Sequence, residues 1–215
     1  MSNNQWALKP SEVFNAGPVV PVIVITKIEQ ALPLAKALLD GGIKVMEVTL
    51  RTDCGIQAIA DIAKAYPESL IGAGTVLNAA QLAQVTEAGA KFAISPGATD
   101  ALLAAGQAGS IPFIPGVVSP SELMAAQSHG YDHVKFFPAE TNGGVKALKA
   151  LGAPFKGIKI CPTGGISINN APDYLALDIV DCIGGSWIVP VDLVEAGEWA
   201  QITKLCKDAV SALSE

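Results

Sequence analysis

Short runs of apolar, often β-branched residues recur along the chain, and each is followed by small or polar residues and then by an alanine-rich stretch. Such a run predicts a buried strand, and the alanine-rich stretch predicts a helix. The centres of the apolar runs lie roughly 20–26 residues apart, which is the spacing of a repeated strand–helix unit. We predict eight strands, at residues 19–25, 45–50, 70–76, 92–95, 113–115, 134–137, 159–162 and 180–184.

Several helix boundaries can be predicted from capping patterns. Residues 119–122 (SPSE) place serine at the N-cap, proline at the first helical position and glutamate at the third, and Asn78 begins a weaker version of this pattern. A short helix is expected near the N-terminus, at 11–16. Pro33 conflicts with a helix that starts at Thr26, because proline is disfavoured in a helix interior.

Strict alternation of strands and helices argues for a parallel sheet, since parallel neighbours need helical crossovers. Eight such units predict a single-domain (β/α)8 TIM barrel spanning residues 1–215, preceded by a short helix. A doubly wound open sheet is the alternative. In a barrel, functional side chains gather at the carboxyl ends of the strands, so these ends are where candidate chemistry is sought.

Composition narrows the classes of partner. The net charge is −6 and the sequence pI is about 4.9, and no cluster of Lys and Arg is present, which argues against a nucleic-acid partner. The four cysteines lack C-x-x-C spacing and there are two histidines, so neither a metal site nor a disulfide framework is expected. No cofactor is expected. No signal peptide or membrane-spanning stretch can be recognised, which favours a cytoplasmic location without membrane association.

Lys135 is unusual because it lies within an otherwise apolar predicted strand, 134–137. Burial disfavours the charged form of a lysine, and a neutral amine is a nucleophile. The structural alternative is a lysine on an edge strand whose stem covers apolar surface while its head reaches water. An interior barrel strand has no such edge, so the predicted fold favours the nucleophile.

Three polar side chains share one face of the predicted strand 45–50. A period of two puts Glu47, Thr49 and Arg51 on the same side. Glu47 and Arg51 are about 13 Å apart by strand rise, so each needs a different partner. Thr75 lies at the carboxyl end of the next predicted strand, 70–76, and is a further polar residue there. Without the other polar residues, Thr75 would be interpreted only as a residue that leads into a helix.

Two glycine pairs mark the last two strand ends. Residues 162–165 (PTGG) end the seventh strand and residues 183–186 (IGGS) end the eighth. Loops at these two ends commonly hold phosphate in this fold through backbone N–H groups. The pattern therefore predicts a phosphate site that needs no basic patch. Cys161 and Cys182 are read as buried strand residues, and residues 142–144 (NGG) as a helix start.

Taken in order, these motifs resemble the bacterial 2-keto-3-deoxy-6-phosphogluconate (KDPG) aldolases and 4-hydroxy-2-oxoglutarate aldolases. The matching segments are EVTLRT (47–52), GAGTV (72–76), ISPG (94–97), KFFPAE (135–140), CPTGGI (161–166) and GGSW (184–187). The resemblance implies a Schiff-base role for Lys135 and a general acid/base role for Glu47. It further implies that Arg51 and Thr75 bind the pyruvyl carboxylate, that Phe137 and Pro96 line the pocket, and that the phosphate is surrounded by Thr163, Gly164, Gly165, Gly185 and Ser186.

The resemblance also implies an activity, namely that of a metal-free class I aldolase, a carbon–carbon lyase of the Entner–Doudoroff pathway. It would cleave KDPG to pyruvate and glyceraldehyde 3-phosphate, with a side activity on 4-hydroxy-2-oxoglutarate, and would assemble as a homotrimer. Several alternatives stay open. They are the galactonate-type C4 epimer as substrate, a phosphate-binding barrel isomerase or epimerase in which Glu47 abstracts a proton, a metal-dependent aldolase, and a barrel that only binds a phosphosugar.

Overall fold

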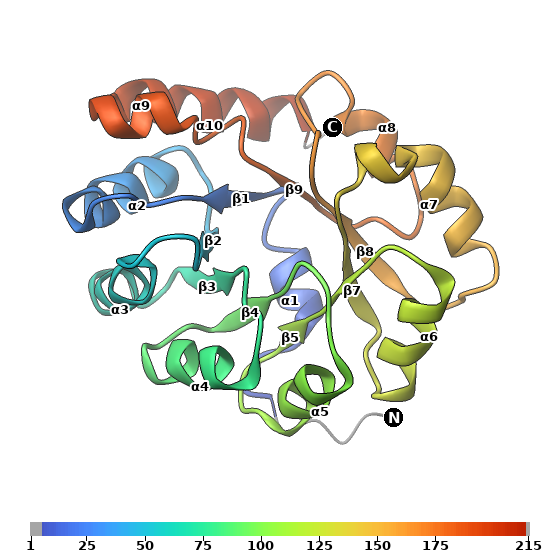
Figure 1. The fold of residues 1–215 in the computed structure, drawn as a ribbon. Coiled ribbons are helices and arrows are strands. Elements are labelled where there is room, and N and C mark those ends of the chain that lie inside the picture. The colour runs from blue at the N-terminus through green and yellow to red at the C-terminus, as the bar shows by residue number, and fades with distance from the viewer. Residues whose placement is uncertain (1–5, 214–215) are drawn as a thin grey trace.

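The computed structural model describes residues 6–213, and helices surround the strands (Figure 1). The strands are β1 (Val19–Ile23), β2 (Val45–Thr49), β3 (Leu70–Gly74), β4 (Phe92–Ile94), β5 (Phe113–Ile114), β6 (Gly116–Val117), β7 (His133–Phe136), β8 (Lys159–Pro162) and β9 (Ile183–Gly185). The helices are α1 (Pro10–Phe14), α2 (Ala31–Asp40), α3 (Gly55–Ala65), α4 (Ala79–Glu87), α5 (Asp100–Ala108), α6 (Pro120–Ser128), α7 (Gly144–Gly152), α8 (Ala171–Leu175), α9 (Val191–Ala196) and α10 (Trp199–Leu213), with short 3-10 helices η1 (Ile28–Gln30) and η2 (Glu140–Asn142).

The strands form two parallel sheets. One has six strands in the order β5-β4-β3-β2-β1-β9, and the other has three in the order β6-β7-β8. Within each sheet, β1 to β5 and β6 to β8 follow one another in chain order, and β9 pairs with β1. A doubly wound sheet would instead reverse its strand order partway across. The predicted α/β class with a parallel sheet is confirmed. No helix within residues 6–213 is both long enough and apolar enough to span a membrane.

The fifth predicted strand is divided in two. Strands β5 and β6 are separated by Pro115, which has no N–H to donate to a ladder. The Pro115 carbonyl instead accepts a hydrogen bond from Lys135 N, at 2.9 Å. Just beyond it, Gly116 approaches the Pro96 backbone so closely that a Cβ there would lie 2.3 Å from the Pro96 carbonyl oxygen. The chain thus passes from the six-stranded to the three-stranded sheet at this proline.

The predicted helix starts are confirmed where capping groups were recognised. The Ser119 hydroxyl accepts from Glu122 N at 3.3 Å, and the Glu122 carboxylate accepts from Ser119 N at 2.8 Å. Asn78 Oδ1 accepts from Gln81 N at 2.9 Å. A helix starting at Thr26 was the wrong boundary, because η1 comes first and α2 begins at Ala31. Pro33 therefore lies in the first helical turn, where backbone N–H groups have no partner within the helix.

The strands have apolar contacts on both sides. Between strands and helices lies a large apolar cluster, and a smaller cluster includes Val20, Val45 and Phe92 from three strands together with Val13 and Phe14 of α1. The Phe14 ring meets the ring of His133, the first residue of β7, with centroids 4.9 Å apart. Helix α1 therefore covers the amino ends of the strands, and the carboxyl ends are left for the site.

Candidate active site

Two buried, oppositely charged side chains meet between the sheets. Lys135 comes from β7 and Glu47 from β2, and the lysine Nζ lies 3.0 Å from Glu47 Oε1. The residues are 5% and 1% exposed. Since a buried charge is costly unless it is paired, each side chain needs the other. The structure thus brings together the two residues that the sequence nominates for catalysis, although 88 positions separate them.

Local geometry fixes both members of this pair. Glu47 pairs in register with Gly72 of β3, and its carboxylate occupies the space beside Gly74. A Cβ at Gly74 would lie 2.2 Å from Glu47 Oε1, so only glycine leaves room for the carboxylate. On the other side, Lys135 Nζ lies 5.4 Å from the centroid of the Phe137 ring. The ammonium is therefore held between a carboxylate and an aromatic face.

Arg51 and Thr75 follow the carboxyl ends of β2 and β3. Arg51 Nε donates to Thr75 Oγ1 at 3.4 Å. Thr75 has a φ of 59°, in the left-handed region that a β-branched residue seldom adopts. Such a conformation costs about 1–3 kcal/mol and persists only where surrounding bonds enforce it. Here Leu50 N donates to Gly74 O at 2.8 Å and Val76 N donates to Ile94 O at 3.1 Å, on either side of Thr75.

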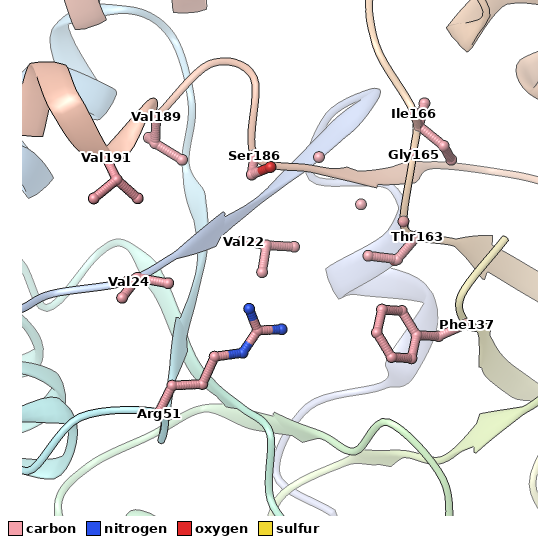
Figure 2. A pocket seen from close by; sticks show the side chains of 13 residues that line it. Val22, Val24, Arg51, Phe137, Thr163, Gly165, Ile166, Ser186, Val189 and Val191 are labelled. Carbon is pink, nitrogen blue, oxygen red and sulfur yellow. The ribbon is translucent and has the colours of Figure 1, made fainter. Parts of the chain in front are cut away.

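A cavity of about 320 Å³ opens at this end of the strands (Figure 2). The Arg51 guanidinium points into it, with Phe137 and Thr163 across the space. Seven predicted site residues line it: Arg51, Phe137, Thr163, Gly164, Gly165, Gly185 and Ser186. Six lining residues were missed: Val22, Val24, Ile166, Gly184, Val189 and Val191. The run 19–25 is apolar throughout, so its pattern does not distinguish Val22 and Val24 from the other strand residues. Gly184 lies in β9 within the predicted glycine pair, and Ile166, Val189 and Val191 carry no periodic signal.

Four predicted residues are not in the cavity wall itself. Lys135 is next to the lining residue Phe137, and Glu47 is next to Lys135. Thr75 contacts the lining residue Arg51. Pro96 does not line the cavity and packs with its backbone against Gly116, so its pocket-lining role stays a prediction.

The loop after β8 has the form of an anion site. The Gly164 carbonyl accepts from Glu140 N at 3.1 Å, and the Gly165 carbonyl accepts from Asn170 Nδ2 at 3.2 Å. Because C=O and N–H point in opposite directions across a trans peptide, the N–H groups of Gly165 and Ile166 point away from these donors. Within residues 6–213 neither N–H has a hydrogen-bond acceptor, and both residues line the cavity. Two such free N–H groups suit a phosphate.

Other polar and metal-binding groups near the strands were also considered. Cys161 and Cys182 are buried, as predicted, and burial raises the pKa of the Cys182 thiol well above its usual value. Among residues 6–213, no group of three or more His, Cys, Asp or Glu side chains is arranged to hold a metal ion.

Comparison with known proteins agrees with this arrangement. The family described as KDPG and KHG aldolase matches residues 11–205. The KHG/KDPG aldolase of Escherichia coli (strain K12) is 58% identical over 205 residues, 95% of this chain and 96% of that protein. The 2-dehydro-3-deoxy-phosphogluconate aldolase of Dickeya dadantii is 55% identical over 206 residues, 96% of this chain and 97% of that protein.

A solved structure extends the similarity to the fold. The KDPG aldolase of Legionella pneumophila, determined with pyruvate captured as a covalent carbinolamine intermediate, is 52% identical, with a TM-score of 0.94 over 95% of this chain and all of that one. On both sequence and structure, the chain belongs to the KDPG and KHG aldolase family.

Proposed function

We propose that the protein is a class I aldolase that cleaves 2-keto-3-deoxy-6-phosphogluconate to pyruvate and glyceraldehyde 3-phosphate, and that it also acts on 4-hydroxy-2-oxoglutarate. The observation that carries the proposal is the buried contact of 3.0 Å between Lys135 Nζ and Glu47 Oε1. A proton passed along this contact leaves a neutral amine beside a carboxylic acid. That combination provides a nucleophile and a general acid in one place.

The chemistry then follows from these two groups. The Lys135 amine attacks the C2 ketone to give a carbinolamine, and Glu47 protonates the departing hydroxyl so that water leaves and an iminium forms. Glu47 next takes the proton of the C4 hydroxyl, and the electrons of the C3–C4 bond move into the iminium. Glyceraldehyde 3-phosphate leaves, and the enamine is protonated at C3 and hydrolysed to pyruvate and free Lys135.

Substrate binding is divided between two ends of the site. Arg51 and Thr75 hold the pyruvyl carboxylate, for which a guanidinium is well suited. The phosphate is held by Thr163, Gly164, Gly165, Gly185 and Ser186, with the free N–H groups of the β8 loop as donors. Anchoring both ends directs binding energy toward orienting C2 at the amine. Assaying the gluconate-type and galactonate-type epimers side by side assigns the preferred configuration at C4.

We further infer that the two sheets form one closed (β/α)8 barrel and that residues 1–215 act as a single domain. Two features support closure. Pro115 alone separates β5 from β6, and an isolated parallel bridge between Thr163 and Gly184 links β8 to β9. By family resemblance, the enzyme works in the cytoplasm as a homotrimer, and exposed apolar side chains such as Leu77 and Met124 offer surface for subunit contacts.

Incubation with pyruvate and sodium borohydride tests the proposed function. The imine of Lys135 and pyruvate should be reduced to a stable secondary amine, and peptide mass spectrometry should locate the added mass on Lys135. Omitting pyruvate is the control. An active enzyme that forms no adduct would contradict a Schiff-base mechanism and favour the isomerase or epimerase alternative, in which Glu47 abstracts a proton and Lys135 only stabilises charge.

Replacing Gly74 with alanine should lower kcat by about 10²-fold, because the new methyl group displaces the Glu47 carboxylate and a shift of about 1 Å in a catalytic group has an effect of that size. Steady-state cleavage assays measure it. Gly17→Ala is the matched control, since a Cβ at Gly17 meets no atom within 4 Å. Unchanged kcat in Gly74→Ala would mean that Glu47 does not need its observed position.

A further inference from the structure

A hydrogen bond between Glu140 and Tyr174 joins the segment that follows β7 to helix α8. Glu140 is the first residue of η2 and lies five positions beyond Lys135, and Tyr174 is a fully buried residue of α8. The Tyr174 hydroxyl donates a hydrogen bond to Glu140 Oε1. The Glu140 backbone N–H donates to the Gly164 carbonyl at 3.1 Å. Glu140 therefore links the buried Tyr174 to the peptide unit between Gly164 and Gly165, and the N–H of this unit is the free N–H of Gly165.

The Glu140 side chain is closely confined by two glycines. A Cβ at Gly165 would lie 2.7 Å from Glu140 Cβ and Cγ, and one at Gly144 would lie 3.0 Å from both Glu140 Oε1 and the Tyr174 hydroxyl oxygen. Both glycines have left-handed φ angles, 78° at Gly165 and 54° at Gly144. The absence of a side chain at Gly165 therefore lets Glu140 Cβ and Cγ lie against the backbone of the loop.

The charge of Glu140 makes its direction important. A carboxylate beside the anion-binding loop would repel a phosphate, but Glu140 is not among the residues that line the cavity, and one of its oxygens is held by Tyr174. Burial, and then the hydrogen bond to Glu140, raise the pKa of Tyr174, so the phenol keeps its proton as a donor. Tyr174 thus restrains the Glu140 carboxylate at a position outside the cavity wall.

We propose that the Glu140–Tyr174 pair positions the phosphate-binding loop, and so determines the enzyme's preference for phosphorylated over unphosphorylated keto acids. The inference rests on the proposed function, since it assumes that the phosphate binds at residues 163–165. Neither residue contacts the reacting atoms. Tyr174 acts through Glu140, and Glu140 acts through Gly164 and Gly165.

Tyr174→Phe tests the proposal, because it removes the donor and leaves the aromatic ring. We expect KM for KDPG to rise about tenfold, the effect of losing one hydrogen bond to a charged group, with little change in kcat. Pyruvate has no phosphate, so the pyruvate concentration that gives half-maximal borohydride trapping on Lys135 should be unchanged. Equal weakening toward both ligands, or an unchanged KM for KDPG, would overturn the proposal.

Two further variants separate positioning from charge. Glu140→Gln keeps an acceptor for Tyr174 but removes the negative charge, so its KM for KDPG should stay near the native value. Adding Glu140→Gln to Tyr174→Phe should restore part of the lost affinity, since the released side chain is then neutral. If Tyr174→Phe folds too poorly to assay, Glu140→Ala removes the same hydrogen bond from a solvent-exposed position. Because it also removes the charge, KM for KDPG should rise by less than in Tyr174→Phe, and half-maximal trapping with pyruvate should again be unchanged. An unchanged KM in this variant would overturn the positioning role.

Tyr131→Phe is the matched control for a buried tyrosine. Its hydroxyl donates to the Leu103 carbonyl at 2.7 Å, away from the phosphate loop, so its loss should change thermal stability without changing KM for KDPG. The native enzyme separates the two hypotheses. If it neither cleaves KDPG nor traps pyruvate, the proposed function fails. If it does both and Tyr174→Phe leaves KM unchanged, only the positioning role fails.

Discussion

Lys135→Ala should abolish cleavage of KDPG, with kcat lower by on the order of 10⁴-fold or more, the scale seen when a catalytic nucleophile is removed. No imine can form without the amine, so trapping with pyruvate and borohydride should add no mass to the protein. The variant should also be less stable by about 3–5 kcal/mol, because Glu47 loses the partner of a buried ion pair. Denaturant unfolding measures this second effect.

Lys159→Ala is the control for this variant. Lys159 is also a strand lysine paired with a carboxylate, Asp181, at 2.6 Å, but it lies at the amino end of β8, opposite His133. Its replacement should leave pyruvate trapping intact. Lys135→Arg keeps a positive charge beside Glu47 and separates loss of pairing from loss of nucleophile. An arginine variant that still cleaves KDPG would rule out Lys135 as the nucleophile.

Glu47→Gln should lower kcat by about 10²- to 10⁴-fold, which is the usual contribution of a general acid or base. Glutamine has the shape of glutamate and can still accept a hydrogen bond from Lys135, but it cannot exchange the protons of the C2 and C4 oxygens. The imine with pyruvate should therefore form slowly yet remain trappable. Rates of cleavage and of borohydride inactivation, measured on the same preparation, distinguish the two steps.

Glu122→Gln is the matched control, since the Glu122 carboxylate also accepts hydrogen bonds, from Val118 N and Ser119 N, but does so at the start of α6. It should affect stability and not turnover. If Glu47→Gln turned over normally, the proton shuttle would have to be assigned to another group.

Much of the architecture was predictable because its causes are local. The strand–helix rhythm follows from the order of apolar and small residues, and the start of α6 follows from Ser119 and Glu122. The division of the fifth strand was not predicted. Pro115 lies within an apolar run, and only the close approach of Gly116 to Pro96 shows why the chain changes sheets there. Similarly, η1 moves the start of α2 to Ala31 and so accommodates Pro33.

Part of the candidate site could be predicted from the sequence, and part became visible only in the structure. Periodicity predicted that Glu47 and Arg51 share one face of a strand, and the two glycine pairs predicted a phosphate-binding loop. In the structure, Arg51 and both glycine pairs line the cavity. The sequence did not indicate that Glu140 and Tyr174 are in contact, because a glutamate and a tyrosine 34 positions apart have no shared pattern. Nor did it indicate that Thr75 has a φ of 59°, since the residues on either side of Thr75 are held by hydrogen bonds with Leu50 and Ile94, which are distant in sequence.

The sequence by itself determined most of the strands and helices, the parallel arrangement and the kinds of side chain at each strand end, since these follow from propensity and periodicity along the chain. Only the tertiary structure decided which of those side chains meet. Lys135 and Glu47 lie within 3.0 Å because β7 and β2 bring them together from different sheets, and because Gly74 leaves room for the carboxylate. Contacts of this kind depend on packing between distant segments, and a buried charge is tolerated there only when that packing supplies its partner.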